Sequence, residues 1–186
     1  MAEVDEFAAQ AGIPAKTIHA DLEKWRNQLL AAREKRVKPL RDEKVLTSWN
    51  GLMIAALAKG FAVTGNQSYL EAAERALNFV RTRLISGDGR LLRSFYAGES
   101  GHPAFLEDYT FLVWGIIELY GATLNGEYLR VATTLSKETL RLFADESSYG
   151  LFDTGSDAEN ILIRKKSAAD GVIPSGNSVA AINFRG

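Results

Sequence analysis

The sequence has no cysteine, only two histidines and only four prolines among its 186 residues. Without cysteine the chain forms no disulfide, offers no thiolate to a metal ion and has no thiol nucleophile. Two histidines leave little scope for a histidine metal centre. The sequence also contains no phosphate-binding glycine loop, no serine nucleophile elbow and no metal-binding motif. We therefore expect neither a metal nor a cofactor.

Long apolar runs and an excess of one charge are also missing. No stretch approaches the ~18 apolar residues of a membrane span, and the acidic N-terminus MAEVDEFAAQ does not resemble a signal peptide. The formal net charge is −1, which favours neither nucleic acid nor another polyanion as a partner. The basic residues between Arg33 and Lys44 alternate with acidic ones, as in a solvated connector. We expect a cytoplasmic protein that binds no nucleic acid and no membrane.

The composition, 46% hydrophobic and 24% charged, is that of a globular protein of one domain or at most two. Residues 1–40 are expected to form leading helices. The first ends at Gly12, and Pro14 suits the first turn of the second. The second helix has one apolar stripe, formed by Ile18, Leu22, Trp25, Leu29 and Ala32.

The stretch from Arg41 to Phe61 is the centre of the pattern. From Leu52 to Phe61 only Lys59 is charged, and a helix that is apolar nearly all round is buried on all sides. We predict such an inner helix over 48–64. Ser68 with Glu71 predicts a capping box that opens an outer helix with a single apolar stripe. A short extended segment is expected at 91–96.

The pattern then recurs 59 residues later. Five residues of the first hairpin have counterparts in the second: Thr64, Asn66, Tyr69, Leu70 and Ala73 correspond to Thr123, Asn125, Tyr128, Leu129 and Ala132. We predict a second inner helix over 111–120, an outer helix over 127–143, a strand at 161–164 and a third inner helix over 176–182. The expected fold is all-α, a series of helical hairpins with boundaries at 41–100, 101–160 and 161–186.

The sequence stops inside the third inner helix, so we expect a piece of a longer protein. Without neighbouring hairpins, Val179, Ile182 and Phe184 should be exposed at one edge. Exposed apolar patches usually mark an interface. We predict that the isolated chain self-associates or is markedly less stable than its parent, and has little or no catalytic activity.

Several motifs resemble one known family. DEKVLTSWNGLMIAALA, FLEDYTFL and the late DGVIPSGNSVAA are similar to sequences of the spermatogenesis-associated thioredoxin-like proteins, in that order and spacing. In that family a thioredoxin-like domain precedes a helical toroid, the (α/α)6 barrel of six-hairpin sugar enzymes. The resemblance implies that this chain is part of the toroid. It also implies that a thioredoxin-like domain and the remaining hairpins are its partners within a parent protein.

The toroid of this family is similar to those of N-acylglucosamine 2-epimerase, cellobiose epimerase and related glycosidases, which bind sugars at one end of the inner helices. The resemblance therefore implies a sugar-like small molecule as ligand. The epimerases use histidines as proton carriers, whereas His19 and His102 lie in no recognised motif of this sequence. That is a departure from the epimerase pattern.

Polar residues gather at the predicted amino ends of the inner helices. Glu107 and Asp108 are adjacent carboxylates and could supply an acid and a base for sugar chemistry, or a helix cap and a solvated side chain. Asp42 could join them in catalysis or pair with Lys44 instead. Candidate binding residues are Lys44, Trp49, Asn50, Tyr109, Asp170, Ser175 and Asn177.

Each of these assignments has an alternative. The aromatic rings of Trp49 and Tyr109 could stack on a sugar or belong to the core. Asn50 and Asn177 could position loops, and Asp170 fits an ordinary turn. We predict that Asp42, Asn50, Asp108 and Asn177 converge on one polar depression.

Two functions remain open from the sequence. One is a carbohydrate-binding or carbohydrate-modifying toroid, of the isomerase, epimerase or glycosidase kind. The other is a non-catalytic helical scaffold that serves the thioredoxin-like domain. The polar residues at the inner-helix amino ends favour the first, because a scaffold would place its distinctive residues on the outer helices.

Overall fold

The computed structural model describes residues 2–158 and 163–185, and the chain divides into two compact units, Met1–Asp42 and Glu43–Gly186. The first unit contains α1 (Ala2–Ala11) and α2 (Ala15–Glu34). Gly12 has a φ of +67° and reverses the chain between them, and Pro14 is the residue before α2. Both predicted leading helices are therefore confirmed.

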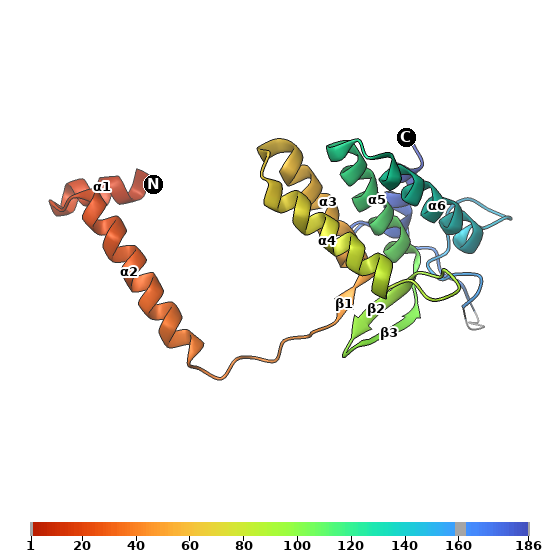
Figure 1. The fold of residues 1–186 in the computed structure, drawn as a ribbon, viewed down its shortest axis with the longest axis horizontal. Coiled ribbons are helices and arrows are strands. Elements are labelled where there is room, and N and C mark those ends of the chain that lie inside the picture. The colour runs from red at the N-terminus through yellow and green to blue at the C-terminus, as the bar shows by residue number, and fades with distance from the viewer. Residues whose placement is uncertain (1, 159–162, 186) are drawn as a thin grey trace. The chain divides into compact units, whose positions relative to one another are not determined.

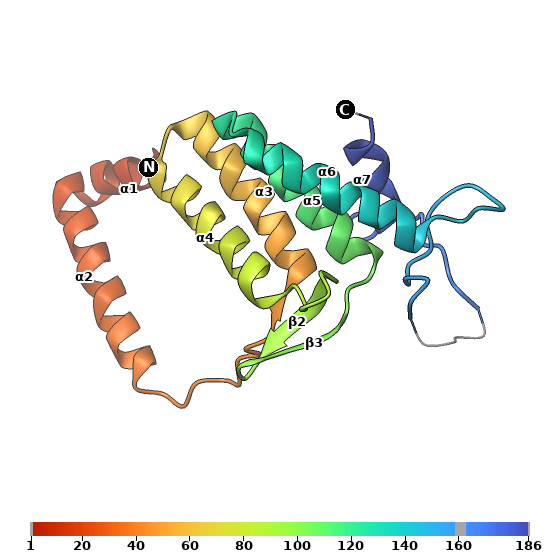
Figure 2. The same cartoon turned by 45° about the vertical axis from the view of Figure 1, so that its right-hand side comes forward.

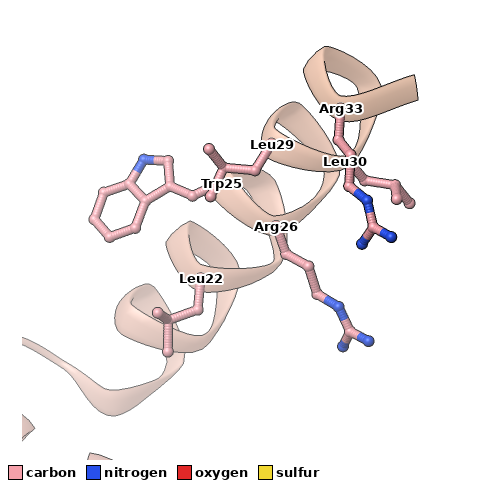
Figure 3. A pocket seen from close by; sticks show the side chains of 6 residues that line it. All are labelled: Leu22, Trp25, Arg26, Leu29, Leu30 and Arg33. Carbon is pink, nitrogen blue, oxygen red and sulfur yellow. The ribbon is translucent and has the colours of Figure 1, made fainter. Parts of the chain in front are cut away.

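The apolar stripe of α2 is exposed. No residue of α2 is buried, and Trp25 and Leu29 are 53% and 71% exposed. Figure 3 shows Leu22, Trp25 and Leu29 standing out from the helix beside Arg26 and Arg33.

The second unit is built mainly from two helical hairpins and the start of a third (Figures 1 and 2). In chain order its helices are α3 (Thr47–Thr64), α4 (Gln67–Arg83), α5 (Leu106–Thr123), α6 (Gly126–Phe143) and α7 (Gly176–Asn183). Inner helix α5 packs between α3 and α7, while α4 and α6 pack on the outside of α3 and α5. The predicted inner and outer helices are confirmed.

The two long inner helices approach closely at glycines. A Cβ atom added to Gly51 would lie 2.5 Å from main-chain atoms of Phe111 and Leu112, and one added to Gly115 would lie 2.6 Å from the Gly51 carbonyl oxygen. Real Cβ atoms do not come this close to main-chain atoms. Glycine at both positions is therefore required for the observed contact between α3 and α5.

The prediction that inner helices are buried on all sides holds for α5 and is wrong for α3. In α5 the side chains from Phe111 to Val113 are at most 1% exposed. In α3, by contrast, Trp49 and Met53 are 63% and 56% exposed. The physical reason is that α5 lies between two inner helices, whereas α3 packs against α5 alone among them.

The repeated sequence motif is explained by the turn within each hairpin. The Thr64 and Thr123 hydroxyls each donate to a main-chain carbonyl one helical turn earlier. Each hydroxyl oxygen also accepts a hydrogen bond from the main-chain N–H of the asparagine two residues later. Asn66 and Asn125 then accept from a main-chain N–H at the start of the outer helix. The helix cap is therefore Asn66, and the prediction of Ser68 as the capping residue is wrong. Asn66 accepts from the Ser68 N–H, so α4 begins at Gln67 and its cap lies two residues before the predicted one.

A three-stranded antiparallel sheet lies where the inner helices begin (Figure 1). Its strands are β1 (Val45–Leu46), β2 (Leu92–Tyr96) and β3 (Glu99–Pro103), in the order β1-β2-β3. The extended segment expected at 91–96 corresponds to β2. A two-residue turn, Ala97 and Gly98 with φ of 52° and 92°, joins β2 to β3. Strands β1 and β3 were not predicted.

Two further expectations are partly corrected. The strand predicted at 161–164 falls partly outside the described residues, and Ile163 and Arg164 are not in a strand. At the expected exposed edge Ile182 and Phe184 are 60% and 42% exposed, but Val179 is 1% exposed. Val179 is buried because α7 packs against α5, so it faces the core rather than the edge.

Candidate functional site

A pocket of about 340 Å³ lies between the amino ends of α5 and α7. We call it the amino-end pocket. The connection between α6 and α7 completes its wall. The lining residues are Phe105, Leu106, Glu107, Asp153, Thr154, Ser167, Ala169, Ile173, Pro174, Ser175 and Gly176. Glu107 and Ser175 are the two predicted site residues in this wall.

Glu107 is held by an arginine from the sheet. The Arg93 Nη1 atom, on β2, lies 3.1 Å from Glu107 Oε1, and both side chains are about one-third exposed. The Arg93 guanidinium also lies over the Phe105 ring, 4.6 Å from its centroid. Glu107 is thus a partly exposed carboxylate with a fixed neighbour, as a group that contacts a ligand requires.

Asp108 is fully buried and joins two inner helices. Its Oδ1 accepts a hydrogen bond from the Ser48 N–H in the first turn of α3, at 3.0 Å. Its Oδ2 accepts from the Phe105 N–H at 2.9 Å and lies 3.4 Å from Arg93 Nη1. Burial raises the pKa of the Asp108 carboxyl, and these hydrogen bonds and the Arg93 charge act in the opposite direction. The geometry is that of a shared helix cap, and a catalytic role for Asp108 stays a prediction.

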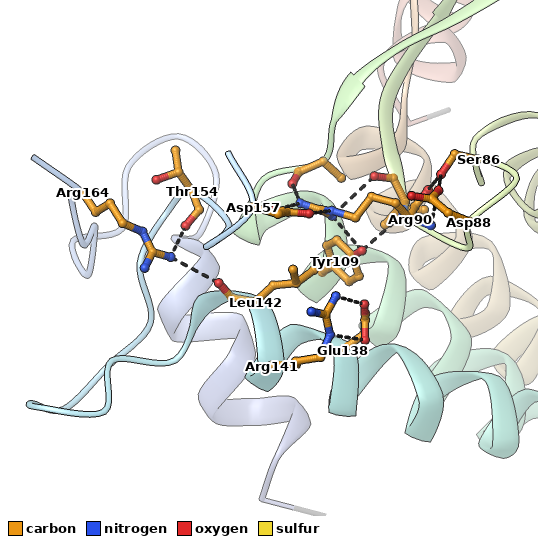
Figure 4. Close-up of polar contacts among 12 residues, drawn as sticks. Ser86, Asp88, Arg90, Tyr109, Glu138, Arg141, Leu142, Thr154, Asp157 and Arg164 are labelled. Carbon is orange, nitrogen blue, oxygen red and sulfur yellow. Dashed lines mark hydrogen bonds and ion pairs between the residues drawn. The ribbon is translucent and has the colours of Figure 1, made fainter. Parts of the chain in front are cut away.

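Tyr109 is buried in the core and belongs to a polar network around Arg90 (Figure 4). Arg90 Nη1 donates to the Tyr109 hydroxyl at 2.7 Å, and Arg90 Nε donates to Asp157 Oδ2, also at 2.7 Å. The Tyr109 ring packs edge-on against Phe143. This location matches the interpretation of Tyr109 as a core residue, since the ring does not line the amino-end pocket.

The predicted residues of the third hairpin position the main chain. Asp170 Oδ1 accepts a hydrogen bond from the Ser175 N–H, and the Ser175 hydroxyl oxygen caps α7 by accepting from Ser178 N–H. The Asn177 amide oxygen accepts from the Leu151 N–H, and its NH2 group donates to the carbonyls of Leu151 and Ser167. These contacts hold the connection between α6 and α7 against the amino end of α7.

The predicted residues around the start of α3 are not among those that line the amino-end pocket. Trp49 is largely exposed, and the Asn50 amide donates to the Leu46 carbonyl at 2.8 Å. Lys44 is exposed and precedes β1. Asp42 belongs to the first unit of the chain. The predicted convergence of Asp42 with Asn50, Asp108 and Asn177 therefore stays a prediction.

Sequence reasoning did not find most of the pocket wall. Thr154, Ser167 and Asp153 come from an irregular connection, where no periodicity marks a residue as inward-facing. The Thr154 hydroxyl oxygen is buried and has no hydrogen-bond partner among the described residues. Asp153 accepts hydrogen bonds from both the N–H and the hydroxyl of Ser167, at 3.0 and 2.6 Å. The recurrence of short polar side chains close to Asp-Gly and Pro-Ser turns was the only available signal.

Metal and membrane features are absent from the part of the chain that the structure describes. Residues 2–158 and 163–185 contain no group of three or more carboxylate or histidine side chains placed to hold a metal ion. Over the same residues no helix combines the length and the apolar character that crossing a bilayer requires.

Comparison with known proteins finds similar sequences over most of the chain. No protein-family model matches the chain. Human spermatogenesis-associated protein 20 is 33% identical over 187 residues, which is 95% of this chain and 24% of that protein. A Caenorhabditis elegans protein, uncharacterized protein B0495.5, is 30% identical over 97% of this chain and 25% of its own length. The chain thus spans about a quarter of the length of the curated relatives it matches.

Solved structures share the fold at low sequence identity. Cellobiose 2-epimerase from Spirochaeta thermophila matches 76% of this chain and 37% of its own chain, with a TM-score of 0.60 and 16% identity. Unsaturated glucuronyl hydrolase from Bacillus sp. GL1 matches 81% of this chain and 42% of its own, with a TM-score of 0.58 and 14% identity. The helical hairpins described above therefore form part of an α/α toroid. Over about 95% of its length the chain is homologous to spermatogenesis-associated protein 20.

Proposed function

We propose that this chain is the part of a carbohydrate-binding or carbohydrate-modifying toroid that contains the amino-end pocket. The thioredoxin-like domain and the remaining hairpins of the parent protein would be its partners. The observation that supports the proposal is the mixed wall of the pocket, in which an aromatic ring, apolar side chains and hydroxyls surround two partly exposed carboxylates, Glu107 and Asp153. Sugars combine apolar faces with hydroxyls, and a few placed polar groups among apolar ones suit them.

The Thr154 hydroxyl is the most specific polar feature of this wall. This hydroxyl is buried without a hydrogen-bond partner, so a rotation of the Thr154 side chain that turns it toward the pocket would let a ligand hydroxyl restore the lost hydrogen bond. Glu107 stands in the same wall and is a carboxylate that a ligand could reach, whereas Asp108 is engaged by two main-chain N–H groups. We therefore assign ligand contact to Glu107 and Thr154, and the support of the first turns of α3 and α5 to Asp108.

The test is a binding measurement on the whole 186-residue chain. Glucose, mannose, N-acetylglucosamine and cellobiose would be titrated by NMR. For a ligand of this size an affinity of about 1 mM is expected. Thr154→Val keeps the shape and removes only an unpartnered hydroxyl, so it should weaken binding severalfold without lowering stability. Thr133→Val, on the exposed face of α6, is the matched control and should leave binding unchanged. Absence of binding by all four sugars would contradict the proposal.

The alternative function, a helical interaction scaffold, is favoured by a different observation. The exposed stripe of α2 presents Leu22, Trp25 and Leu29 together (Figure 3), and such a stripe is typical of a helix that packs against another protein surface. If the chain is only a scaffold, none of the sugars will bind. The chain would instead form a complex with the thioredoxin-like domain of the parent protein, and Trp25→Ser would weaken that complex.

A further inference from the structure

The amino-end pocket has an uneven distribution of charge. Its wall contains two carboxylates, Glu107 and Asp153, and no lysine, arginine or histidine among the described residues that line it. An anionic ligand would therefore meet two like charges and no cation in the pocket wall.

Two guanidinium groups close to this wall already have partners, and the exposed Lys165 side chain is not among the lining residues. The Arg93 guanidinium forms ion pairs with two carboxylates. Its Nη1 atom lies 3.1 Å from Glu107 Oε1 and 3.4 Å from Asp108 Oδ2. Arg164 lies over the Phe152 ring and donates to the main-chain carbonyls of Leu142 and Thr154. A ligand anion could engage Arg93 only by breaking these ion pairs. The buried Arg164 Nε–H has no partner among the described residues, but Arg164 does not line the pocket.

Several main-chain N–H groups at the amino ends of the helices already have hydrogen-bond acceptors. The Phe105 N–H donates to Asp108, and the Leu106 N–H donates to the Asp153 carbonyl at 3.0 Å. At the start of α7 the Ser175 N–H donates to Asp170 at 2.9 Å. The buried Asp108 carboxylate also offsets the positive end of the α5 dipole. Three main-chain donors at these helix starts are thus already occupied.

The remaining groups suit an uncharged ligand. The unpartnered Thr154 hydroxyl can both donate and accept, and the Phe105 ring and Ile173 supply apolar area in the same wall. We propose that the amino-end pocket selects uncharged, hydroxyl-rich ligands, that is neutral sugars, and discriminates against their anionic analogues such as uronates and sugar phosphates. This inference rests on the proposed carbohydrate function and names the ligand class of that same site.

The experiment compares sugars that differ only in charge. Glucose with glucuronate, galactose with galacturonate and mannose with mannuronate form matched pairs, in which a carboxylate replaces the terminal hydroxymethyl group. Each would be titrated against the 186-residue chain at low and at physiological salt. We expect the uronate to bind at least about tenfold more weakly than its neutral partner, with a smaller ratio at physiological salt because salt screens the repulsion.

Two variants separate the pocket from the net charge of the chain. Glu107→Gln removes one negative charge from the wall and should reduce the ratio of neutral to uronate affinity. Glu71→Gln makes the same change on the exposed surface of outer helix α4 and should leave the ratio unchanged. A ratio that does not respond to Glu107→Gln would overturn the inference.

The two proposals fail in different ways. If a uronate binds as tightly as its neutral partner or more tightly, the charge selection is wrong and the carbohydrate function stands. If neither member of any pair binds, the carbohydrate function itself is wrong. Tight binding of neutral sugars together with weak binding of uronates supports both.

Discussion

At the scale of single residues, Asp108 links the starts of two inner helices. Its carboxylate accepts from the Ser48 N–H in the first turn of α3 and from the N–H of Phe105, the residue before α5, and its side chain is fully buried. Asp108→Ala leaves both N–H groups without their acceptor inside the protein. We expect the free energy of unfolding to fall by about 2–4 kcal/mol, since buried unsatisfied groups cost about 1–3 kcal/mol each.

Urea denaturation followed by circular dichroism would measure this loss. Glu107→Gln is the control, because its partly exposed ion pair with Arg93 is worth at most about 1 kcal/mol. Equal stability of Asp108→Ala and the parent chain would show that the shared cap is unimportant.

Asp157 provides a prediction about pH. The hydrogen bond from Arg90 holds the pKa of the Asp157 carboxyl below its usual value, despite partial burial. A lowered pKa stabilises the fold above the unfolded pKa of about 3.9, and this contribution is lost as pH falls through the lower folded value. Because the Asp157 side chain is 40% exposed, solvent screens the pair, and Asp157→Asn should destabilise the chain at pH 7 by at most about 1 kcal/mol.

The difference in stability between Asp157→Asn and the parent chain should shrink as the pH falls from 5 to 2. Urea midpoints at four pH values would measure it, with Glu71→Gln as a charge control on the surface. A difference that stays constant with pH would mean that the Arg90 contact does not depend on the Asp157 charge.

Residue types at the candidate site could be predicted from the sequence better than their roles. Glu107 and Ser175 were expected at the site and line the pocket, because helix-start signals locate them along the chain. The partner of Asp108 could not be predicted, since the Ser48 N–H is 60 residues away and nothing local marks the pair. Thr154 could not be predicted either, because an irregular connection has no period from which burial can be read.

At the scale of elements, the contact between α3 and α5 depends on two glycines. Gly51→Ala would place a methyl group 2.5 Å from the main chain of Phe111 and Leu112, and main-chain atoms of a buried helix cannot move aside cheaply. We expect a loss of stability of about 2–3 kcal/mol or more from this overpacking.

Gly121→Ala is the matched control. It lies in α5, the helix that Gly51 packs against, is exposed, and an added Cβ meets nothing within 4 Å. Alanine favours helix over glycine by up to about 1 kcal/mol, so this variant should be neutral or more stable. Thermal unfolding of the two variants would compare them, and similar melting temperatures would rule out the close helix contact.

Elements with a strong period were predictable and short ones were not. The 59-residue repeat located the helices of both hairpins, since their periodicity is set by burial. Strands β1 and β3 were missed because β1 has two residues and β3 is largely exposed. The repeat also contained the Thr-x-Asn turn, but the choice of Asn66 over Ser68 as cap depends on main-chain geometry.

At the scale of the whole molecule, the exposed apolar side chains predict self-association. Trp49 and Met53 on α3 and Ile182 on α7 are each more than half exposed. We expect light scattering to give a mass above the 20.4 kDa of one chain, increasing with protein concentration. Ile182→Glu should reduce association.

Val172→Glu is a suitable control for this experiment. Val172 is fully exposed in the connection before α7, so the same charge is added outside the helical edge. A chain that remains a monomer at all concentrations would contradict the prediction.

The position of Asp108 has a consequence for the order of events during synthesis. Ser48, in the first turn of α3, is synthesised 60 residues before Asp108, so this turn forms before its acceptor has been translated. The Thr47 hydroxyl donates to the Leu92 carbonyl, which is also synthesised later, as part of β2. The hydrogen bonds at the amino end of the first hairpin therefore form only after the start of the second hairpin has been synthesised. We expect the two hairpins to reach their final structure together rather than one after the other.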